Sequence, residues 1–295
     1  MRVLLTGANG FIGRNVTERL VGQNMEFVTL GRSGKVDLLH DLQLPMVWTP
    51  DQPIDAVLHL AAESGVRDFD YRSRDNNLEA TQNVLDWATT NKVKMVLLAS
   101  SASVYGNQTL MEETTSCVPM SPSAESKYDC EILVNRWAKQ EGRVGVNMRV
   151  FNAVGKHQRA GTFPDIVCNH FRKLKAGDTD ELKIFGSRLR SWTYVGDVVN
   201  GFWSALQTFY NGKAGTKLAL NLGTSAMLNQ RAFVDLIADR VKIKPNIVQM
   251  EPNPLDIQRT KADMARFSAI FGWLPDHRNI AVAIDELVHE YGLSG

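Results

Sequence analysis

The chain has 295 residues, of which 44% are hydrophobic and 22% charged, and its formal net charge is +1. This length accommodates one large domain or two small ones, and the small net charge gives no electrostatic reason to expect nucleic acid or an anionic membrane as a partner. No apolar run approaches the roughly 20 residues that span a bilayer, and the first residues lack the pattern of a secretory signal. Three scattered cysteines favour reduced thiols over a disulfide framework or a metal site. We therefore expect a cytoplasmic, globular protein without a metal.

The first half of the chain alternates β-branched runs with amphipathic helical stretches. Strand–helix alternation of this kind predicts a parallel sheet that is covered by helices on both faces. The expected fold class is therefore α/β, with a Rossmann-type doubly wound parallel sheet. The predicted strands are residues 2–6, 27–30, 54–60, 93–100 and 145–151, and the predicted helices are residues 11–22, 72–90 and 123–141.

From about residue 163 the alternation loosens, and we interpret this half as a smaller α/β C-terminal lobe with at least one segment that returns to the main sheet. The Rossmann-type domain is expected at residues 1–162, joined by residues 196–223, which return to it. The smaller lobe then comprises residues 163–195 and 224–295. Its half of the chain is expected to contain helices at residues 165–176, 196–210, 230–241 and 280–291, strands at 183–185, 217–222 and 246–250, and a turn at 252–254.

Residues 7–13 read Gly-Ala-Asn-Gly-Phe-Ile-Gly and lie between the first predicted strand and the first predicted helix. Glycines here permit a tight turn and a close approach of the backbone to a pyrophosphate, which would lie at the positive end of the helix. The strand before the turn and the helix after it make the pattern stronger than an isolated glycine motif. The expected cofactor contacts are Gly7, Asn9, Gly10, Phe11, Ile12 and Gly13.

The end of the second predicted strand indicates which dinucleotide is bound. In NAD-binding folds an acidic residue about twenty positions after the turn binds the ribose diol. This chain has Gly31, Arg32 and Ser33 there, so no carboxylate repels a 2′-phosphate and Arg32 could pair with one. We predict NADP as the preferred cofactor, with NAD possible, and Arg32 and Ser33 as contacts. The alternative is that Arg32 is a solvated surface charge.

Taken in order along the chain, these motifs resemble those of the extended short-chain dehydrogenase/reductases, specifically the NAD(P)-dependent nucleotide-sugar epimerases, dehydratases and 4-ketoreductases. Residues 6–13 are similar to the family's TGxxGxxG loop, residues 59–62 to its HLAA stretch, and residues 100–106 to its catalytic serine strand. The resemblance implies further cofactor contacts beside the adenine and along the HLAA stretch. These are Asp37, Leu38, Leu60, Ala61 and Ala62.

The resemblance also implies a catalytic serine and a Tyr-x-x-x-Lys pair. Ser101 is expected to orient the reacting C4 oxygen of a sugar, with Ser103 as a nearby alternative. Lys127 is expected to bind the nicotinamide ribose and to lower the pKa of the phenol. The tyrosine position, one helical turn before Lys127, holds Ser123 instead. The expected catalytic set is therefore Ser101, Ser123 and Lys127, with Ser123 too short and too weak an acid to replace a phenol.

Three explanations of Ser123 remain open. It is an engineered change, a natural variant that uses another acid, or the mark of a non-catalytic relative. The candidate acids are Glu125, Ser103 and a water held by Ser123. Tyr128 lies about 100° around the helix from Lys127 and cannot take the missing place. Loss of general acid–base catalysis costs roughly 10²–10⁴-fold in rate.

The second half of the chain carries the resemblance to a substrate site. Asn152 is expected to contact the diphosphate region of a nucleotide sugar, and Arg190 and Arg259 to hold the diphosphate, because guanidinium groups match paired phosphate oxygens. Ser101 and Ser103 are expected to contact the sugar. The expected partners are a nucleotide-diphosphate sugar and a second copy of the chain, with helices 72–90 and 123–141 pairing in a homodimer.

We expect an NAD(P)-dependent nucleotide-sugar epimerase or reductase that acts at C4 of the sugar by hydride transfer, with a site altered by Ser123. Epimerase and 4-ketoreductase both remain open. A 4,6-dehydratase is disfavoured, because Ala102 and Ser103 supply no carboxylate after Ser101. The alternative is a non-catalytic dinucleotide-binding sensor or regulatory protein of the same fold.

Overall fold

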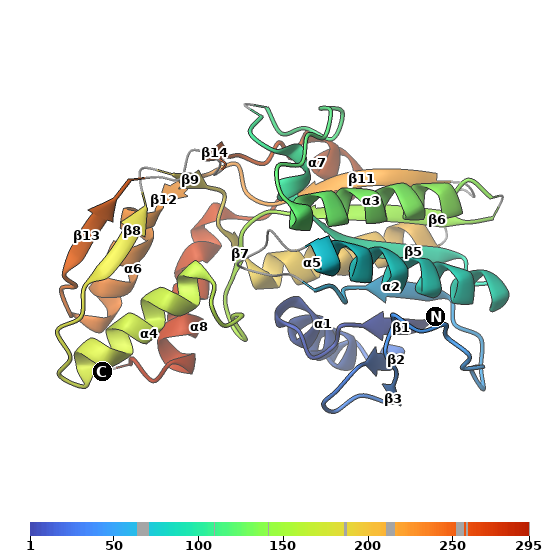
Figure 1. Ribbon diagram of the computed structural model, residues 1–295, viewed down its shortest axis with the longest axis horizontal. Helices are drawn as coiled ribbons and strands as arrows, with labels where there is room; N and C mark the ends of the chain where they lie inside the picture. The colour runs from blue at the N-terminus through green and yellow to red at the C-terminus, as the bar shows by residue number, and fades with distance from the viewer. Residues whose placement is uncertain are drawn as a thin grey trace.

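The computed structural model describes residues 1–63, 71–108, 110–140, 142–185, 188–210, 216–251, 257 and 259–294. In this part of the chain the largest element is a seven-stranded parallel sheet with the order β3-β2-β1-β4-β5-β6-β11 (Figure 1). This order confirms the predicted Rossmann-type doubly wound fold. The strands are β1 (Arg2–Thr6), β2 (Glu26–Gly31), β3 (Leu38–Leu39), β4 (Ala56–His59), β5 (Met95–Ser101), β6 (Val144–Val150) and β11 (Thr216–Leu222).

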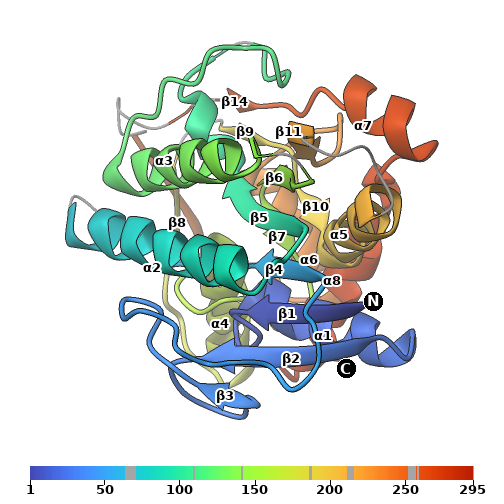
Figure 2. The same ribbon diagram turned by 90° about the vertical axis from the view of Figure 1, so that its right-hand side faces the viewer.

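Helices cover both faces of the sheet (Figure 2). On one face lie α2 (Tyr71–Thr90) and α3 (Pro122–Trp137), and on the other lie α1 (Phe11–Gly22) and α5 (Val195–Tyr210). Side chains of β1 alternate between the two apolar clusters: Val3 and Leu5 pack on the α1 side and Leu4 on the α2 side. This two-sided burial explains why the central strands are almost continuously apolar.

A smaller lobe lies beside the sheet (Figure 1). It consists of α4 (Phe163–Lys175), α6 (Gln230–Val241), α8 (Ile280–Glu290) and the parallel pair of β8 (Leu182–Phe185) and β13 (Ile247–Met250), and it encloses its own apolar cluster. Between α4 and α6 the chain returns to the main sheet as α5 and β11, and β11 pairs in parallel with β6.

Short strands connect the lobe to the sheet. β7 (Ala153–Val154) pairs with β10 (Thr193–Tyr194), and β9 (Leu189–Arg190) lies between β12 (Leu228–Asn229) and β14 (Arg259–Thr260). Strands of two residues have no hydrophobic periodicity, so the sequence did not predict them. The sequence also did not predict four other short elements, which are β3, the 3₁₀ turns η1 (Ala102–Tyr105) and η2 (His277–Asn279), and α7 (Ala265–Phe271).

The predicted bounds of β1, α1 and α6 agree with the structure residue for residue. Helix α3 begins at Pro122, one residue before the prediction, because Ser121 caps it: the Ser121 hydroxyl accepts a hydrogen bond from Ala124 N–H, and proline suits the first turn. The helix ends at Trp137 rather than at residue 141. Glu141 and the turn expected at residues 252–254 lie outside the described residues.

Candidate active site

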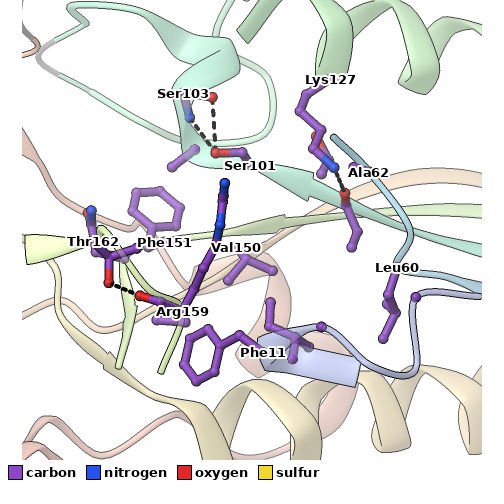
Figure 3. A pocket seen from close by; sticks show the side chains of 18 of the residues that line it. Phe11, Leu60, Ala62, Ser101, Ser103, Lys127, Val150, Phe151, Arg159 and Thr162 are labelled. Atoms are coloured by element: carbon purple, nitrogen blue, oxygen red, sulfur yellow. Dashed lines mark hydrogen bonds between the residues drawn. The ribbon is translucent and has the colours of Figure 1, made fainter. Parts of the chain in front are cut away.

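A cavity of about 1290 Å³ lies between the carboxyl ends of the central strands and the small lobe (Figure 3). Most of the residues predicted from the sequence line it, although they come from seven separate stretches of the chain. Those that line it are Gly7, Asn9, Gly10, Phe11, Ile12, Gly13, Arg32, Leu60, Ala62, Ser101, Ser103, Lys127, Asn152 and Arg190. Those that do not are Ser33, Asp37, Leu38, Ala61, Ser123 and Arg259.

The glycine turn forms one wall of the cavity. Gly7 has φ +74°, and a Cβ atom there would lie 2.6 Å from the backbone nitrogen of Ala61. A Cβ on Gly13 would lie 2.0 Å from the carbonyl oxygen of Gly7. Gly10 is the N-cap residue of α1, and no side chain caps the first N–H groups of that helix. An uncapped helix start beside a backbone without side chains fits the pyrophosphate of a dinucleotide.

The last residue of β4 and the segment that follows it support the glycine turn through the hydroxyl of Thr6. Ala61 N–H donates to the hydroxyl of Thr6, and the His59 ring lies 2.8 Å from the same hydroxyl and 3.1 Å from that of Thr81. Burial lowers the pKa of His59 to about 3, so its imidazole is neutral at pH 7. Ala61 thus supports the turn, while its neighbours Leu60 and Ala62 face the cavity.

The residues after β2 lie at the rim of the cavity. Arg32 has 63% of its side chain exposed and forms an ion pair with Glu63 at 3.2 Å. Asn9 donates to the carbonyl of Ser33 at 2.7 Å, which ties this loop to the glycine turn. One oxygen of the Asp37 carboxylate accepts hydrogen bonds from the backbone and the hydroxyl of Thr29. Asp37 is therefore held against β2, and its predicted contact with adenine stays a prediction.

Ser101 ends β5 and caps η1. Its Oγ accepts hydrogen bonds from the backbone N–H of Ser103 at 3.1 Å and from the Ser103 hydroxyl at 3.0 Å. A serine hydroxyl has two acceptor positions and one proton to donate. Because both acceptor positions are in use, the Ser101 proton is available to an oxygen inside the cavity.

Lys127 enters the cavity from α3 and donates a hydrogen bond to the carbonyl of Ala99 at 2.8 Å. Burial lowers the pKa of its ammonium below the ordinary value, while Cys130 and Glu131 act in the opposite direction. An ammonium has three N–H donors. Because only the Ala99 carbonyl accepts from it among the described residues, two of its N–H donors are available at the cavity.

Ser123 is half-buried on α3, but its side chain does not reach the cavity. Helix α3 contributes Ser121, Ala124 and Lys127 to the wall instead. Glu125, a candidate replacement acid, is directed to α2, where its carboxylate lies 3.7 Å from Arg74. Among the described residues that line the cavity there is no tyrosine.

A buried ion pair fixes α3 on the sheet beneath these groups. The Glu131 carboxylate accepts two hydrogen bonds from Arg149 on β6, at 3.0 and 2.7 Å, and one from the hydroxyl of Ser100 at 2.5 Å. The Arg149 guanidinium also lies 4.8 Å from the ring centre of Tyr105. Because Ser100 precedes Ser101 and Glu131 follows Lys127 by one helical turn, this network sets the position of α3 relative to Ser101.

At the other end of the cavity, two of the expected substrate residues line the wall and one does not. Asn152 lines it and accepts a hydrogen bond from the Thr260 hydroxyl at 3.2 Å, and Arg190 lines it while donating to the carbonyl of Ile257 at 2.6 Å. Arg259 is exposed and does not line the cavity, whereas Thr260 does. Neighbouring residues of a strand point to opposite faces, so only one of the two can face inwards. Contact of Arg259 with a diphosphate stays a prediction.

Arg159, Thr162 and Ser121 also line the cavity and were not predicted from the sequence. Figure 3 shows the Arg159 side chain extending from the loop before α4 toward Ser101. The Thr162 hydroxyl donates to the Arg159 carbonyl at 2.7 Å. No periodicity marks this loop, and the only available signal was its position shortly after Asn152.

The described residues contain no group of His, Cys, Asp and Glu side chains arranged to hold a metal ion. In the same part of the chain, no helix is long and apolar enough to span a membrane.

Comparison with known proteins places the chain in a family. The model of the NAD dependent epimerase/dehydratase family matches residues 3–223. The UDP-glucose 4-epimerase of Mycolicibacterium smegmatis is 28% identical over 304 residues, which cover 93% of this chain and 94% of the relative. A UDP-galactose 4-epimerase structure superposes with a TM-score of 0.84 at 26% identity, over 98% of this chain and 99% of that one. MoeE5 in complex with UDP-glucuronic acid and NAD gives a TM-score of 0.84 at 25% identity, over 98% and 100%. The chain belongs to the NAD-dependent epimerase/dehydratase family.

Proposed function

We propose that the chain binds NAD(P) and a nucleotide-diphosphate sugar side by side and acts at C4 of the sugar, as an epimerase or a 4-ketoreductase. One observation carries this proposal. A single cavity of about 1290 Å³ has the glycine turn at one end, Asn152 and Arg190 at the other, and Ser101 and Lys127 among its lining residues. Pockets for one small ligand measure about 300–1,000 Å³, so this volume suits two ligands.

The cofactor end of the cavity is assigned to the dinucleotide. Gly10 at the start of α1 would hold the pyrophosphate, and Leu60 and Ala62 would flank the rest of the molecule. Lys127 donates its remaining N–H groups to the hydroxyls of the nicotinamide ribose. Arg32 at the rim supports NADP as the preferred form, because it carries the charge that pairs with a 2′-phosphate. A bound nicotinamide ring supplies the acceptor and the donor of the C4 hydride.

Ser101 is assigned to the sugar. Its free proton is donated to the C4 oxygen, which polarises a C4 carbonyl and fixes the orientation of the ring. Asn152 and Arg190 hold the diphosphate at the far end. In the oxidative direction the C4 oxygen must also lose its proton, and Ser123 is not at the cavity wall to receive it. We therefore expect tight binding and slow turnover.

The test is turnover of the chain beside its Ser123→Tyr variant on UDP-, GDP-, CDP- and dTDP-sugars and their 4-keto forms. Absorbance of NAD(P)H and NMR of the products report the reaction. We expect tyrosine to raise the rate at least about 100-fold, the lower range for general acid–base catalysis. If the chain with Ser123 is already fast and gains nothing from tyrosine, another group moves the proton, and Glu125 and Ser103 would be changed next.

The second candidate is a non-catalytic dinucleotide sensor. It is favoured by the position of Ser123 off the cavity wall while the binding residues around it remain. Calorimetric binding of a dinucleotide, without turnover of any sugar by either the chain or its Ser123→Tyr variant, would support it. Stoichiometric oxidation of NADPH by any nucleotide sugar would exclude it.

The proposed enzyme is a homodimer in which α2 and α3 pair with their copies. These helices pack side by side on one face of the sheet (Figure 2), so they offer one continuous outer surface to a partner. Light scattering at micromolar concentration should give twice the mass of the chain. A monomer would contradict this part of the proposal.

A further inference from the structure

An ion pair spans the cavity rim at its cofactor end. Arg32 Nη1 lies 3.2 Å from Glu63 Oε1, and both residues line the cavity. Arg32 follows β2 and Glu63 follows β4, and β1 lies between these two strands. The pair therefore crosses the carboxyl end of β1, where the glycine turn begins. The sequence indicated a role for Arg32 but not for Glu63.

Glu63 is the fixed member of the pair. Its second carboxylate oxygen accepts a hydrogen bond from the Asn76 amide at 2.9 Å. Its backbone N–H donates to Asn77 Oδ1 at 2.7 Å, and its carbonyl accepts from Asn77 Nδ2 at 2.8 Å. Asn77 is buried in α2 and also donates to the hydroxyl of Ser126. The carboxylate is thus held on α2, while Arg32, with 63% of its side chain exposed, is the member that can move away.

The loop after β2 is where a dinucleotide presents its adenosine ribose. This loop is held in place, because Asn9 in the glycine turn donates to the Ser33 carbonyl at 2.7 Å. A ribose with a free 2′-hydroxyl can bind beside an intact Arg32–Glu63 pair. A 2′-phosphate must take Arg32 from Glu63 and then lie close to a carboxylate of its own sign.

We propose that Glu63 is a specificity-determining residue, whose carboxylate competes with the 2′-phosphate of NADP for Arg32 and so reduces the preference for NADP over NAD. This inference rests on the proposed dinucleotide site. NADP binding exchanges the Arg32–Glu63 pair for an Arg32–phosphate pair, whereas NAD binding leaves the first pair in place. The preference of the natural chain is therefore smaller than Arg32 alone would give.

The experiment measures the dissociation constants of NADP and NAD for the full chain by titration calorimetry. Glu63→Gln keeps an oxygen for Asn76 and removes the charge. The matched control is Asp235→Asn, which breaks the exposed pair of Arg231 and Asp235 on α6, far along the chain from the rim. We expect Glu63→Gln to bind NADP about three- to tenfold more tightly, since charges at exposed sites change affinities by small factors. NAD binding should stay within about twofold, and the control should change neither value.

Two further variants keep the result interpretable. Glu63→Ala should give the same change in the dissociation constant of NADP. If the glutamine variant fails to fold, the alanine variant still tests the proposal. Arg32→Ala in the Glu63→Gln background should remove the gain for NADP, because no cation is left to release. Added salt should reduce the difference between the natural chain and Glu63→Gln, since exposed charges are screened.

An unchanged ratio of the two dissociation constants in Glu63→Gln and Glu63→Ala, with both nucleotides binding, would overturn the role of Glu63 and leave the proposed function standing. Failure of the natural chain to bind either nucleotide would overturn both. A gain for NADP that persists after Arg32→Ala would also reject the competition, because the effect would then be a general loss of negative charge.

Discussion

The two ends of the cavity are built from different materials. The cofactor end is a backbone surface, shaped by Gly7 and Gly13, where a Cβ would collide with neighbouring main chain, and by the uncapped start of α1. The reaction end is a set of side chains, above all Ser101 and Lys127, placed by buried contacts. The cofactor end is therefore damaged by adding atoms. At the reaction end, shortening a single side chain removes the chemistry, although the walls of the cavity stay in place.

The largest expected effect lies at position 123. Two substitutions there distinguish the effect of an acidic hydroxyl from the effect of added side-chain volume. Ser123→Tyr adds a ring and an ionisable hydroxyl, whereas Ser123→Phe adds the ring alone. We expect the tyrosine variant to turn over about 10²–10⁴-fold faster than the chain with Ser123, because general acid–base catalysis is restored. The phenylalanine variant should stay within about tenfold of the natural chain. Equal rates in the two variants, measured by product NMR, would mean that shape and not acidity limits this end.

The second largest effect is expected at the buried Glu131–Arg149 ion pair beneath the reaction end. Glu131→Gln leaves the Arg149 guanidinium buried without its carboxylate, and we expect a loss of about 3–5 kcal/mol in the free energy of unfolding. Chemical denaturation measures it. As the control, Asp235→Asn on the surface should cost under about 1 kcal/mol. A small effect at Glu131 would show that α3 is held mainly by its apolar contacts.

At the cofactor end the sharpest comparison is between two glycines of the same helix. Gly13→Ala places a Cβ 2.0 Å from the Gly7 carbonyl oxygen, while Gly22→Ala places one in open space. We expect Gly13→Ala to lose about 1–3 kcal/mol of stability and to weaken dinucleotide binding at least tenfold. Gly22→Ala should be neutral or up to about 1 kcal/mol more stable, as alanine favours helix. Unaltered binding in Gly13→Ala would refute a backbone-built site.

The smallest expected effect is a pH dependence of the stability, which comes from His59 beside the glycine turn. The folded pKa of His59, about 3, lies under the ordinary value of 6.5 because burial opposes the imidazolium. Between these values the unfolded chain takes up a proton that the folded chain excludes, so stability falls as pH falls. We expect about 2 kcal/mol to be lost to this group between pH 7 and pH 5.

Unfolding curves over this pH range check the role of His59. His59→Gln should flatten the pH dependence by the expected amount, whatever its effect on stability at pH 7. His277→Gln is the control, because the His277 side chain is 63% exposed. A slope that is unchanged in His59→Gln would show that other groups titrate in this window.

Several parts of the molecule could be predicted from neighbouring residues. The bounds of β1 and α1 follow from a β-branched run, a glycine turn and an amphipathic period, which are all properties of a short segment. The expectation that Lys127 and Ser101 share a site came instead from the resemblance to a known family, and both residues line the cavity. Local signals work here because strand, turn and helix are determined by contacts between residues close in sequence.

Long-range packing decided the rest. Ser123 holds the tyrosine position of the sequence motif, yet it does not line the cavity, and the Glu125 carboxylate lies beside Arg74 on α2. The pairing of Arg32 with Glu63 joins residues that follow different strands. The sequence by itself determined the sheet, the glycine turn and the order of the motifs. Only the tertiary structure decided which side chains meet, because the reach and direction of a side chain depend on segments that are far apart in the chain.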